Sequence, residues 1–385
     1  MGIFYKCPIC GNEDIKYIGF KNGHPYCRKC ISFKNSTEPK KLNYPKTASI
    51  VLSYELSEEQ KELSDRLLEN YKNGINSLIH AVCGSGKTEI VLGVISYAVR
   101  CGERVAFCIP RRDVVIEIYD RLKEIFKWNK VVAVYGGNTE RLEGDIVVLT
   151  THQLFRYQNY FHLIVLDEID AFPYAGNDLL DTFFKKACIG SYIMMSATPS
   201  KKVIENFKKS NGDILSLNVR FHRHLLPVPE VYIKKKPFYF QTLFHYLSKF
   251  LNETKQVFIF APTIDICENL FAILKFKFKE GNCVHSKKED RAQIINDFKK
   301  QKYKYLVTTA VLERGVTVKN LQVIVFLADH YVYKTHTLVQ IAGRSGRKKD
   351  APEGRVIFIC EKRTEEIDEA INQIEHSNKD MQNMF

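Results

Sequence analysis

Two cysteine pairs near the start of the chain have the spacing of a metal site. Cys7/Cys10 and Cys27/Cys30 form the pattern C-x2-C-x16-C-x2-C. That spacing is typical of a zinc ribbon, in which two knuckles give four thiolates to one tetrahedral ion. A redox pair of the thioredoxin type would need a strand–helix–strand context that this segment lacks. The sequence therefore predicts a Zn²⁺ site in which His24 is a surface residue and not a ligand.

The segment around these cysteines is too short to build a hydrophobic core of its own. A bound metal would hold it together, and we expect two short strands around a turn at Asn22-Gly23. Tyr17, Phe20 and Tyr26 are interleaved with lysine and arginine residues. These aromatic residues either stack on exposed nucleic-acid bases or form the small core of the module. The sequence leaves both interpretations open.

A second motif, A-V-C-G-S-G-K-T, has the pattern of a phosphate-binding loop between an apolar strand and an amphipathic helix. Its glycines let backbone amide groups face phosphate oxygens. Lys87 would reach the β- and γ-phosphates, and the Thr88 hydroxyl would bind Mg²⁺. Ala81 stands where a glycine is usual, which is tolerated if its φ is negative. The predicted ATP site thus comprises Ala81, Gly84, Ser85, Gly86, Lys87 and Thr88.

An acidic strand end downstream supplies the partners that such a loop needs. The run "FHLIVLDEIDAF" indicates a buried strand followed by carboxylates. Asp167 would hold the Mg²⁺, and Glu168 would polarise the attacking water. Asp170 receives no role from the sequence. Gln60, upstream of the loop, either recognises adenine through its amide or is an ordinary surface residue of a polar helix.

The elements that position these motifs alternate between strand and helix from about residue 51. This alternation predicts an α/β fold with parallel sheets flanked by helices. It restarts near residue 225 without a second phosphate loop and ends in G-R-S-G-R. Arg344 and Arg347 would lie one turn apart on a helix and stabilise charge on the first domain's nucleotide. We expect a zinc module at 1–34, a linker at 35–50, an ATP-binding domain at 51–220 and a second domain at 221–385.

The composition is that of a globular protein, with 45% hydrophobic and 26% charged residues. The sequence lacks both an apolar run long enough for a membrane span and the layout of a secretory signal. The net charge of +13 favours a polyanionic partner, nucleic acid or anionic lipid, although such an excess also serves solubility. The cysteines outside the two pairs are isolated and typical of reduced thiols. We therefore expect a cytoplasmic protein.

Together these motifs resemble a superfamily 2 helicase-type motor, which has two tandem RecA-like P-loop domains. A-V-C-G-S-G-K-T, D-E-I-D, S-A-T and Q-I-A-G-R-S-G-R match motifs I, II, III and VI of such motors, and T-T-A-V-L-E-R-G-V-T matches motif V. The resemblance implies that ATP binds in a cleft between the domains and drives movement along a nucleic acid. It also implies that Gly315, Thr317 and Gln340 lie near the nucleotide.

The same resemblance implies which residues contact the nucleic-acid backbone. They lie in "FCIPRRDVV", "VYGG" and "TTHQL" of the first domain and in "FAPT", "VHSKKEDR" and motif V of the second. Contacts to phosphates would be tolerant of base sequence and sensitive to salt. The implied contacts are Pro110, Arg111, Gly136, Thr151, His152 and Gln153 in the first domain, and Thr263, His285, Ser286 and Thr308 in the second.

Finer features narrow the resemblance to one family. Ile341 stands where RNA-directed DEAD-box proteins usually carry arginine, which is similar to the PriA/RecG-like DNA branch. The four-cysteine module with "DEIDAFPY", "RFHRHLLPVPE" and "LERGVTV" closely resembles the ComFA family of late competence proteins. That resemblance implies an ATP- and Mg²⁺-dependent translocase that helps pull single-stranded DNA into transformable bacteria.

The family resemblance further implies movement 3′ to 5′ and docking to other DNA-uptake proteins at the cytoplasmic face of the inner membrane. A homo-oligomer is compatible with the sequence. Three alternatives stay open: a PriA-like replication-restart or repair helicase, an RNA helicase, and a non-catalytic DNA-binding scaffold. Ile341 argues against the RNA helicase. The complete set of Lys87, Asp167, Glu168, Arg344 and Arg347 argues against the scaffold.

Overall fold

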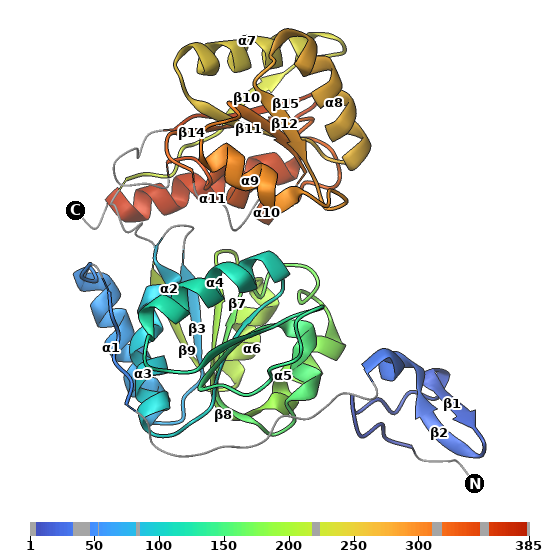
Figure 1. Ribbon diagram of the computed structural model, residues 1–385, viewed down its shortest axis with the longest axis vertical. Helices are drawn as coiled ribbons and strands as arrows, with labels where there is room; N and C mark the ends of the chain where they lie inside the picture. The colour runs from blue at the N-terminus through green and yellow to red at the C-terminus, as the bar shows by residue number, and fades with distance from the viewer. Residues whose placement is uncertain are drawn as a thin grey trace. The chain divides into compact units, whose positions relative to one another are not determined.

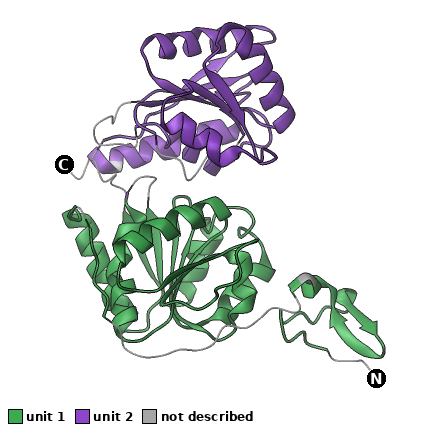
Figure 2. Ribbon diagram, in the orientation of Figure 1, with its two compact units in different colours: residues 1–81, 86–217 green, residues 82–85, 218–385 purple. Residues whose placement is uncertain are grey.

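The computed structural model describes residues 5–33, 47–52, 54–81, 85–217, 224–309, 318–346 and 354–382. The chain divides into two compact units (Figure 2), which consist of residues 1–81 with 86–217 and of residues 82–85 with 218–385. Four predicted site residues lie outside the described residues: Gly84, Gly315, Thr317 and Arg347.

Unit 1 is built around a seven-stranded sheet in which all neighbouring strands are parallel (Figure 1). The strand order is β5-β6-β4-β7-β8-β3-β9. Strands β4 and β6 are buried along their whole length, and β3 and β7 at all but one residue, because helices cover both faces of the sheet. The strands are β3 (Ser77–Ala81), β4 (Val105–Ile109), β5 (Val131–Val134), β6 (Ile146–Thr150), β7 (Phe161–Asp167), β8 (Cys188–Ser196) and β9 (Asp213–Leu217).

Alternate residues of these strands pack into two separate apolar clusters, one on each face. Phe107 and Val165 face helices α1, α3 and α4, whereas Cys108 and Leu166 face α5, α6 and the 3-10 helix η3. This alternation follows from the two-residue period of a strand. The helices are α1 (Glu58–Lys72), α2 (Lys87–Ile90), α3 (Leu92–Arg100), α4 (Arg112–Ile125), η3 (Thr151–Arg156), α5 (Asp178–Ala187) and α6 (Lys201–Lys209).

Unit 2 contains a six-stranded parallel sheet with the order β10-β15-β14-β11-β13-β12. Helices α7 and α8 pack on one face, and α9, α10 and α11 pack on the other. The predicted α/β fold with two parallel sheets is therefore confirmed. The elements are β10 (Glu230–Ile233), α7 (Phe238–Asn252), β11 (Gln256–Phe260), α8 (Ile264–Lys277), β12 (Gly281–Val284), α9 (Arg291–Lys299), β13 (Tyr305–Thr308), β14 (Leu321–Phe326), α10 (Thr335–Ala342), β15 (Val356–Cys360) and α11 (Glu365–Gln382).

The cysteine-containing segment forms the expected hairpin. Strands β1 (Ile18–Lys21) and β2 (His24–Cys27) pair antiparallel and follow the 3-10 helix η1 (Ile15–Tyr17). Asn22 and Gly23 have φ values of 51° and 77°. Two successive positive φ angles are characteristic of the two-residue turn that matches strand twist. A second 3-10 helix, η2 (Arg28–Phe33), carries the last cysteine.

Two helices differ from the sequence prediction. The helix expected to contain Arg344 ends at Ala342, so that Arg344 lies in the following turn. Gly343 is the C-cap residue of this helix, and its backbone amide donates to the carbonyl oxygens of Val339 and Ile341. The helix after the phosphate loop is divided at Val91 into α2 and α3. Among the described residues, no helix has both the length and the hydropathy that a membrane crossing requires.

Candidate nucleotide, nucleic-acid and metal sites

The predicted nucleotide-binding motifs meet at one edge of the unit 1 sheet. The phosphate loop follows β3, Asp167 is the last residue of β7 and Ser196 is the last residue of β8. Strand β8 lies between β3 and β7 in the sheet. Because parallel strands present their carboxyl ends at the same edge, the three motifs lie together where ligands of such sheets bind.

In the described part of the phosphate loop, a glycine in the left-handed conformation directly precedes helix α2. Gly86 has a φ of 81°, which a residue with a side chain adopts only with strain. Lys87 begins α2, and its Nζ lies 3.9 Å from Asp167 Oδ1. Ala81 has the extended backbone of the last residue of β3, so its side chain is accommodated. Ser85, which directly precedes Gly86 in the sequence, is buried.

The oxygen atoms that would hold Mg²⁺ come from two elements. Thr88 is only 7% exposed and Asp167 only 8% exposed. Hydroxyl and carboxylate oxygens are the ligands that Mg²⁺ prefers, so these residues fit the ion. Asp167 Oδ1 also accepts a hydrogen bond of 2.8 Å from the backbone amide of Glu168. Glu168 has a φ of 60°, an uncommon conformation for a residue with a side chain, and its side chain is nearly buried.

Asp170, which had no predicted role, connects two motifs. Its Oδ1 accepts a hydrogen bond of 2.8 Å from Ser196 Oγ, and its Oδ2 accepts one of 3.0 Å from Thr198 Oγ1. The Thr198 amide in turn donates to Ser196 Oγ at 2.9 Å. One carboxylate therefore ties the D-E-I-D segment to the S-A-T segment. The two segments are separated by a helix and a strand in the sequence, which is why motif spacing alone did not pair them.

We expect Asp170→Asn to destabilise unit 1 by about 1–3 kcal/mol, because an amide offers one acceptor oxygen where two hydroxyl donors are now satisfied. Urea-induced unfolding, followed by fluorescence, measures this loss. Glu205→Gln on the exposed face of α6 is the matched control, since it also removes one negative charge. Equal unfolding midpoints for the two variants would contradict the connecting role of Asp170.

Gln60 is a buried residue of α1, contrary to the ordinary surface interpretation. Its side-chain Oε1 accepts a hydrogen bond of 3.0 Å from the backbone amide of Ser57. The backbone amide of Gln60 donates to Ser57 Oγ at 3.2 Å, and the two bonds form a capping box. Its Nε2 lies so close to Gly86 that a Cβ on that glycine would collide with it. Gln60 is thus held against the phosphate loop.

Two ion pairs near this site were not found from the sequence. Glu89, directly after the G-K-T run, is buried and paired with Arg121 of α4. The Tyr54 hydroxyl donates to the same carboxylate at 2.5 Å. Arg111 Nε lies 3.7 Å from Glu168 Oε2. The partners are far apart in the sequence, so no local spacing signals these pairs.

The predicted nucleic-acid contacts of unit 1 lie at the same carboxyl edge of the sheet. Pro110 and Arg111 directly follow β4, and Thr151 begins η3 directly after β6. Thr151 is buried, whereas His152 and Gln153 are partly exposed. Burial lowers the pKa of His152, because the charged imidazolium is disfavoured away from water. Gly136, which follows β5, is exposed.

The predicted contacts of unit 2 are less uniformly accessible. Thr263 caps α8 by accepting a hydrogen bond of 3.2 Å from the Ile266 amide. His285 is buried, and its Nε2 lies 3.0 Å from Glu268 Oε1, whereas Ser286 is exposed. Three further predicted residues of this unit are buried: Thr308, Gln340 and Arg344.

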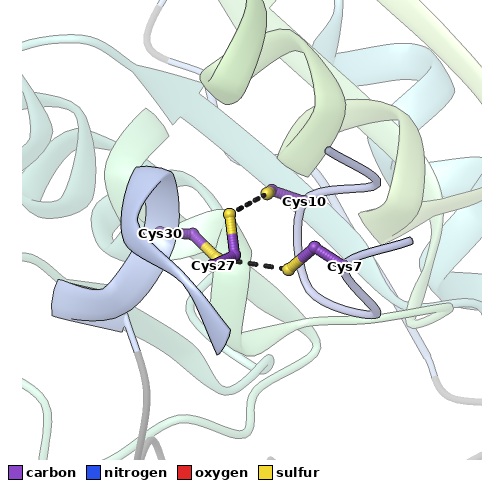
Figure 3. A group of neighbouring side chains, drawn as sticks. All are labelled: Cys7, Cys10, Cys27 and Cys30. Atoms are coloured by element: carbon purple, nitrogen blue, oxygen red, sulfur yellow. Dashed lines mark hydrogen bonds between the residues drawn. The ribbon is translucent and has the colours of Figure 1, made fainter. Parts of the chain in front are cut away.

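The four paired cysteines form a single buried cluster (Figure 3). Cys7 Sγ lies 3.5 Å from Cys30 Sγ, and Cys10 Sγ lies 3.6 Å from Cys27 Sγ. Two sulfurs of a tetrahedral zinc site are separated by ~3.8 Å when each Zn–S bond is about 2.3 Å. Burial raises the pKa of Cys10 to about 11, so a bound cation would be needed to keep this sulfur as a thiolate. The cluster fits Zn²⁺.

The cysteine module packs against α5 of the same unit. Lys186 Nζ donates hydrogen bonds to the carbonyl oxygens of Pro8 and Ile9, at 2.6 and 3.0 Å, inside the first knuckle. The Phe33 ring lies 5.0 Å from the Phe155 ring and 5.1 Å from the Phe183 ring, centroid to centroid. The cysteine module therefore shares an apolar cluster with the sheet of unit 1.

The exposed side of the module carries aromatic and basic residues. Tyr17 is 38% exposed and Phe20 is 53% exposed. Lys16 Nζ lies 5.1 Å from the centroid of the Tyr17 ring, and Lys29 Nζ lies 6.0 Å from it. Tyr26 instead packs over Gly19. The exposure of Phe20 argues against a core role for that residue, whereas Tyr26 is only partly buried.

Comparisons with known proteins agree with this arrangement. Residues 57–207 match the family described as "DEAD/DEAH box helicase", and residues 240–349 match "Helicase conserved C-terminal domain". Among solved structures, the DEAD-box helicase Mss116 bound to single-stranded RNA has a TM-score of 0.65 at 21% identity, over 83% of this chain and 77% of that one. RecG bound to a three-way DNA junction has a TM-score of 0.60 at 19% identity, over 87% of this chain and 49% of that one.

Curated relatives define the family more narrowly. The chain is 25% identical to the ATP-dependent DNA helicase RecG of Staphylococcus epidermidis, over 86% of this chain and 52% of that protein. It is 30% identical to the competence protein ComFA of Streptococcus pneumoniae, over 97% of this chain and 90% of that protein. It is 32% identical to ComFA of Bacillus subtilis, over 97% and 86% of the two chains. The chain therefore belongs to the ComFA family of competence proteins and has the two RecA-like domains of superfamily 2 helicases.

Proposed function

We propose that this protein is a motor that hydrolyses ATP to move along single-stranded DNA during natural transformation. The observation that carries the proposal is the convergence of Lys87, Thr88, Asp167 and Glu168 at one sheet edge, in a chain related to competence proteins over nearly its whole length. The net charge of +13 supports a polyanionic partner.

In this proposal the residues of unit 1 bind ATP and direct its hydrolysis. Lys87 contacts the β- and γ-phosphates, and Thr88 and Asp167 hold Mg²⁺, which screens the phosphate charge when bound. Glu168 orients the water for in-line attack and accepts its proton. Arg344 and Arg347 of the second domain would stabilise charge on the transferred phosphoryl group. Gln60, held against Gly86, would recognise adenine.

The strand would be held through its phosphates by loops of both domains. In unit 1 these loops follow β4, β5 and β6, and in unit 2 they follow β11, β12 and β13. Among the predicted strand contacts, Arg111 carries a positive charge in unit 1, and Ser286 is exposed in unit 2. Because the two domains hold the strand separately, each hydrolysis cycle would advance it. Movement would proceed 3′ to 5′.

The zinc module would add a further contact to the strand. Tyr17 and Phe20 are exposed, and Lys16 and Lys29 lie beside the Tyr17 ring. Exposed aromatic rings with neighbouring cations are suited to stacking on unpaired bases. Docking to other DNA-uptake proteins at the cytoplasmic face of the membrane belongs to the same proposal. The proposed division of the chain is a module at 1–34, a linker at 35–50, an ATP-binding domain at 51–220 and a second domain at 221–385.

A second candidate function is the unwinding of branched duplex DNA, which the RecG relatives favour. Two substrates separate the candidates. A single strand with streptavidin bound to a biotin at one end reports translocation, because a motor that reaches that end displaces the streptavidin. A forked duplex with a labelled strand reports unwinding.

The proposal expects displacement of streptavidin from the 5′ end, little displacement from the 3′ end and weak unwinding of the fork. Efficient unwinding of the fork without streptavidin displacement would replace it with the RecG-like function. Lys87→Ala, which removes the phosphate contact, is the control for ATP dependence.

A further inference from the structure

The pair formed by Arg111 and Glu168 joins a proposed strand contact to the proposed catalytic carboxylate. Arg111 Nε lies 3.7 Å from Glu168 Oε2. The two side chains are 22% and 11% exposed, so the pair is partly shielded from water and its attraction is stronger than that of a surface pair. Both residues follow adjacent strands of one sheet, β4 and β7.

The backbone around Glu168 restricts where its carboxylate can point. Its φ of 60° places the residue in the left-handed region, which is costly for a side-chain-bearing residue and is retained where the surroundings require it. Its amide is bound to Asp167 Oδ1 at 2.8 Å. The Glu168 side chain is therefore attached to a backbone whose conformation is restrained, and the Arg111 guanidinium lies close to its carboxylate.

The distance between Arg111 and Glu168 indicates an attraction that a phosphate group bound to Arg111 can replace. At 3.7 Å the contact is longer than the 2.7–3.2 Å of a hydrogen bond. A guanidinium group forms paired, shorter hydrogen bonds with phosphate oxygens. A strand phosphate that reaches Arg111 would therefore compete favourably with Glu168.

We propose that Arg111 is a positioning residue that restrains Glu168 until nucleic acid binds. Without a strand, the guanidinium holds the Glu168 carboxylate away from the attacking water. When a strand phosphate binds Arg111, the carboxylate is released and ATP hydrolysis accelerates. This inference rests on the proposed function, and it explains how strand binding and hydrolysis are coupled within a single domain.

The test is the rate of ATP turnover by the full chain carrying Arg111→Gln, with and without single-stranded DNA. We expect the rate without DNA to rise about fivefold, the size expected for loss of a partly shielded ion pair. The stimulation by saturating DNA should fall by a similar factor, because the released state is already reached. The DNA concentration for half-maximal stimulation should rise, because one phosphate contact is lost.

Two further variants make the result specific. Arg112→Gln removes the neighbouring positive charge, whose guanidinium lies 4.9 Å from the Tyr135 ring; its rate without DNA should equal that of the wild type. Combining Arg111→Gln with Glu168→Gln should abolish the gain, because the gain requires the released carboxylate.

A rise only in the half-saturating DNA concentration would overturn the inference and leave Arg111 as a simple strand contact. A fall in the rate without DNA would also overturn it, because Arg111 would then support Glu168. In both outcomes the rate without DNA fails to rise, while DNA still stimulates turnover by the wild type. They are therefore distinct from failure of the proposed function, which would appear as wild-type turnover that no strand stimulates.

Discussion

Replacing Glu168 with glutamine is expected to lower ATP turnover about 10³-fold while ATP still binds. Glutamine keeps the size and the hydrogen-bonding oxygen of the side chain but cannot accept a proton from the attacking water. Lys87, Thr88 and Asp167 are unchanged in this variant, so the phosphate contacts remain. The turnover number with saturating single-stranded DNA gives the loss, and binding of a fluorescent ATP analogue verifies the intact site.

Glu205→Gln is a matched control for this prediction, because Glu205 is an exposed glutamate of helix α6 in the same unit, outside the loops of the proposed site. Its turnover should equal that of the wild type. If Glu168→Gln retained more than a tenth of the wild-type rate, another group would have to orient the water. If it lost ATP binding as well, Glu168 would be needed for the shape of the site rather than for the chemical step.

The combined substitution Cys7→Ser and Cys10→Ser is expected to remove one zinc ion per chain and to unfold the module. Each knuckle supplies two of the four sulfurs, and a structural zinc site contributes about 10 kcal/mol or more to the folding of a small domain. Elemental analysis of the purified variant measures the metal. DNA binding, followed by fluorescence anisotropy, should weaken because Tyr17 and Phe20 lose their fixed positions.

Cys101→Ser provides the control, since Cys101 is an exposed cysteine outside the cluster and its loss should leave the zinc content unchanged. ATP binding should survive in the double variant, because the phosphate loop and Asp167 belong to the sheet and not to the module. Retained zinc in the double variant would contradict the four-cysteine site. Unchanged DNA affinity after loss of zinc would contradict a strand contact by the module.

The features that could be predicted from the sequence are those with a local signature. The cysteine spacing predicted the cluster of four thiols, and Asn22-Gly23 predicted the hairpin turn. The segments around the G-S-G-K-T run and around the acids of D-E-I-D could be assigned as strand, loop or helix, because strands and helices differ in the periodicity of their apolar residues. The parallel sheet then follows from alternating strands and helices, and it brings the phosphate loop and Asp167 to one edge.

The remaining features depend on contacts between distant segments, for which a single sequence carries no spacing signal. Asp170 with Ser196 and Thr198, and Arg111 with Glu168, are joined only once the sheet has formed. The same holds for Phe33, which meets Phe183 of α5. The apolar periodicity before Arg344 predicts a helix through that residue, but the helix ends at Ala342 and Arg344 lies in a turn.

The most direct test of the central claim is the rate of ATP turnover by the purified full chain under four conditions: without nucleic acid, and with single-stranded DNA, duplex DNA or single-stranded RNA. The account predicts strong stimulation by single-stranded DNA and little by the others. Equal stimulation by RNA or by duplex DNA would contradict a motor dedicated to single-stranded DNA and would favour a general helicase. Absence of turnover under all four conditions would contradict the proposed activity of the isolated chain.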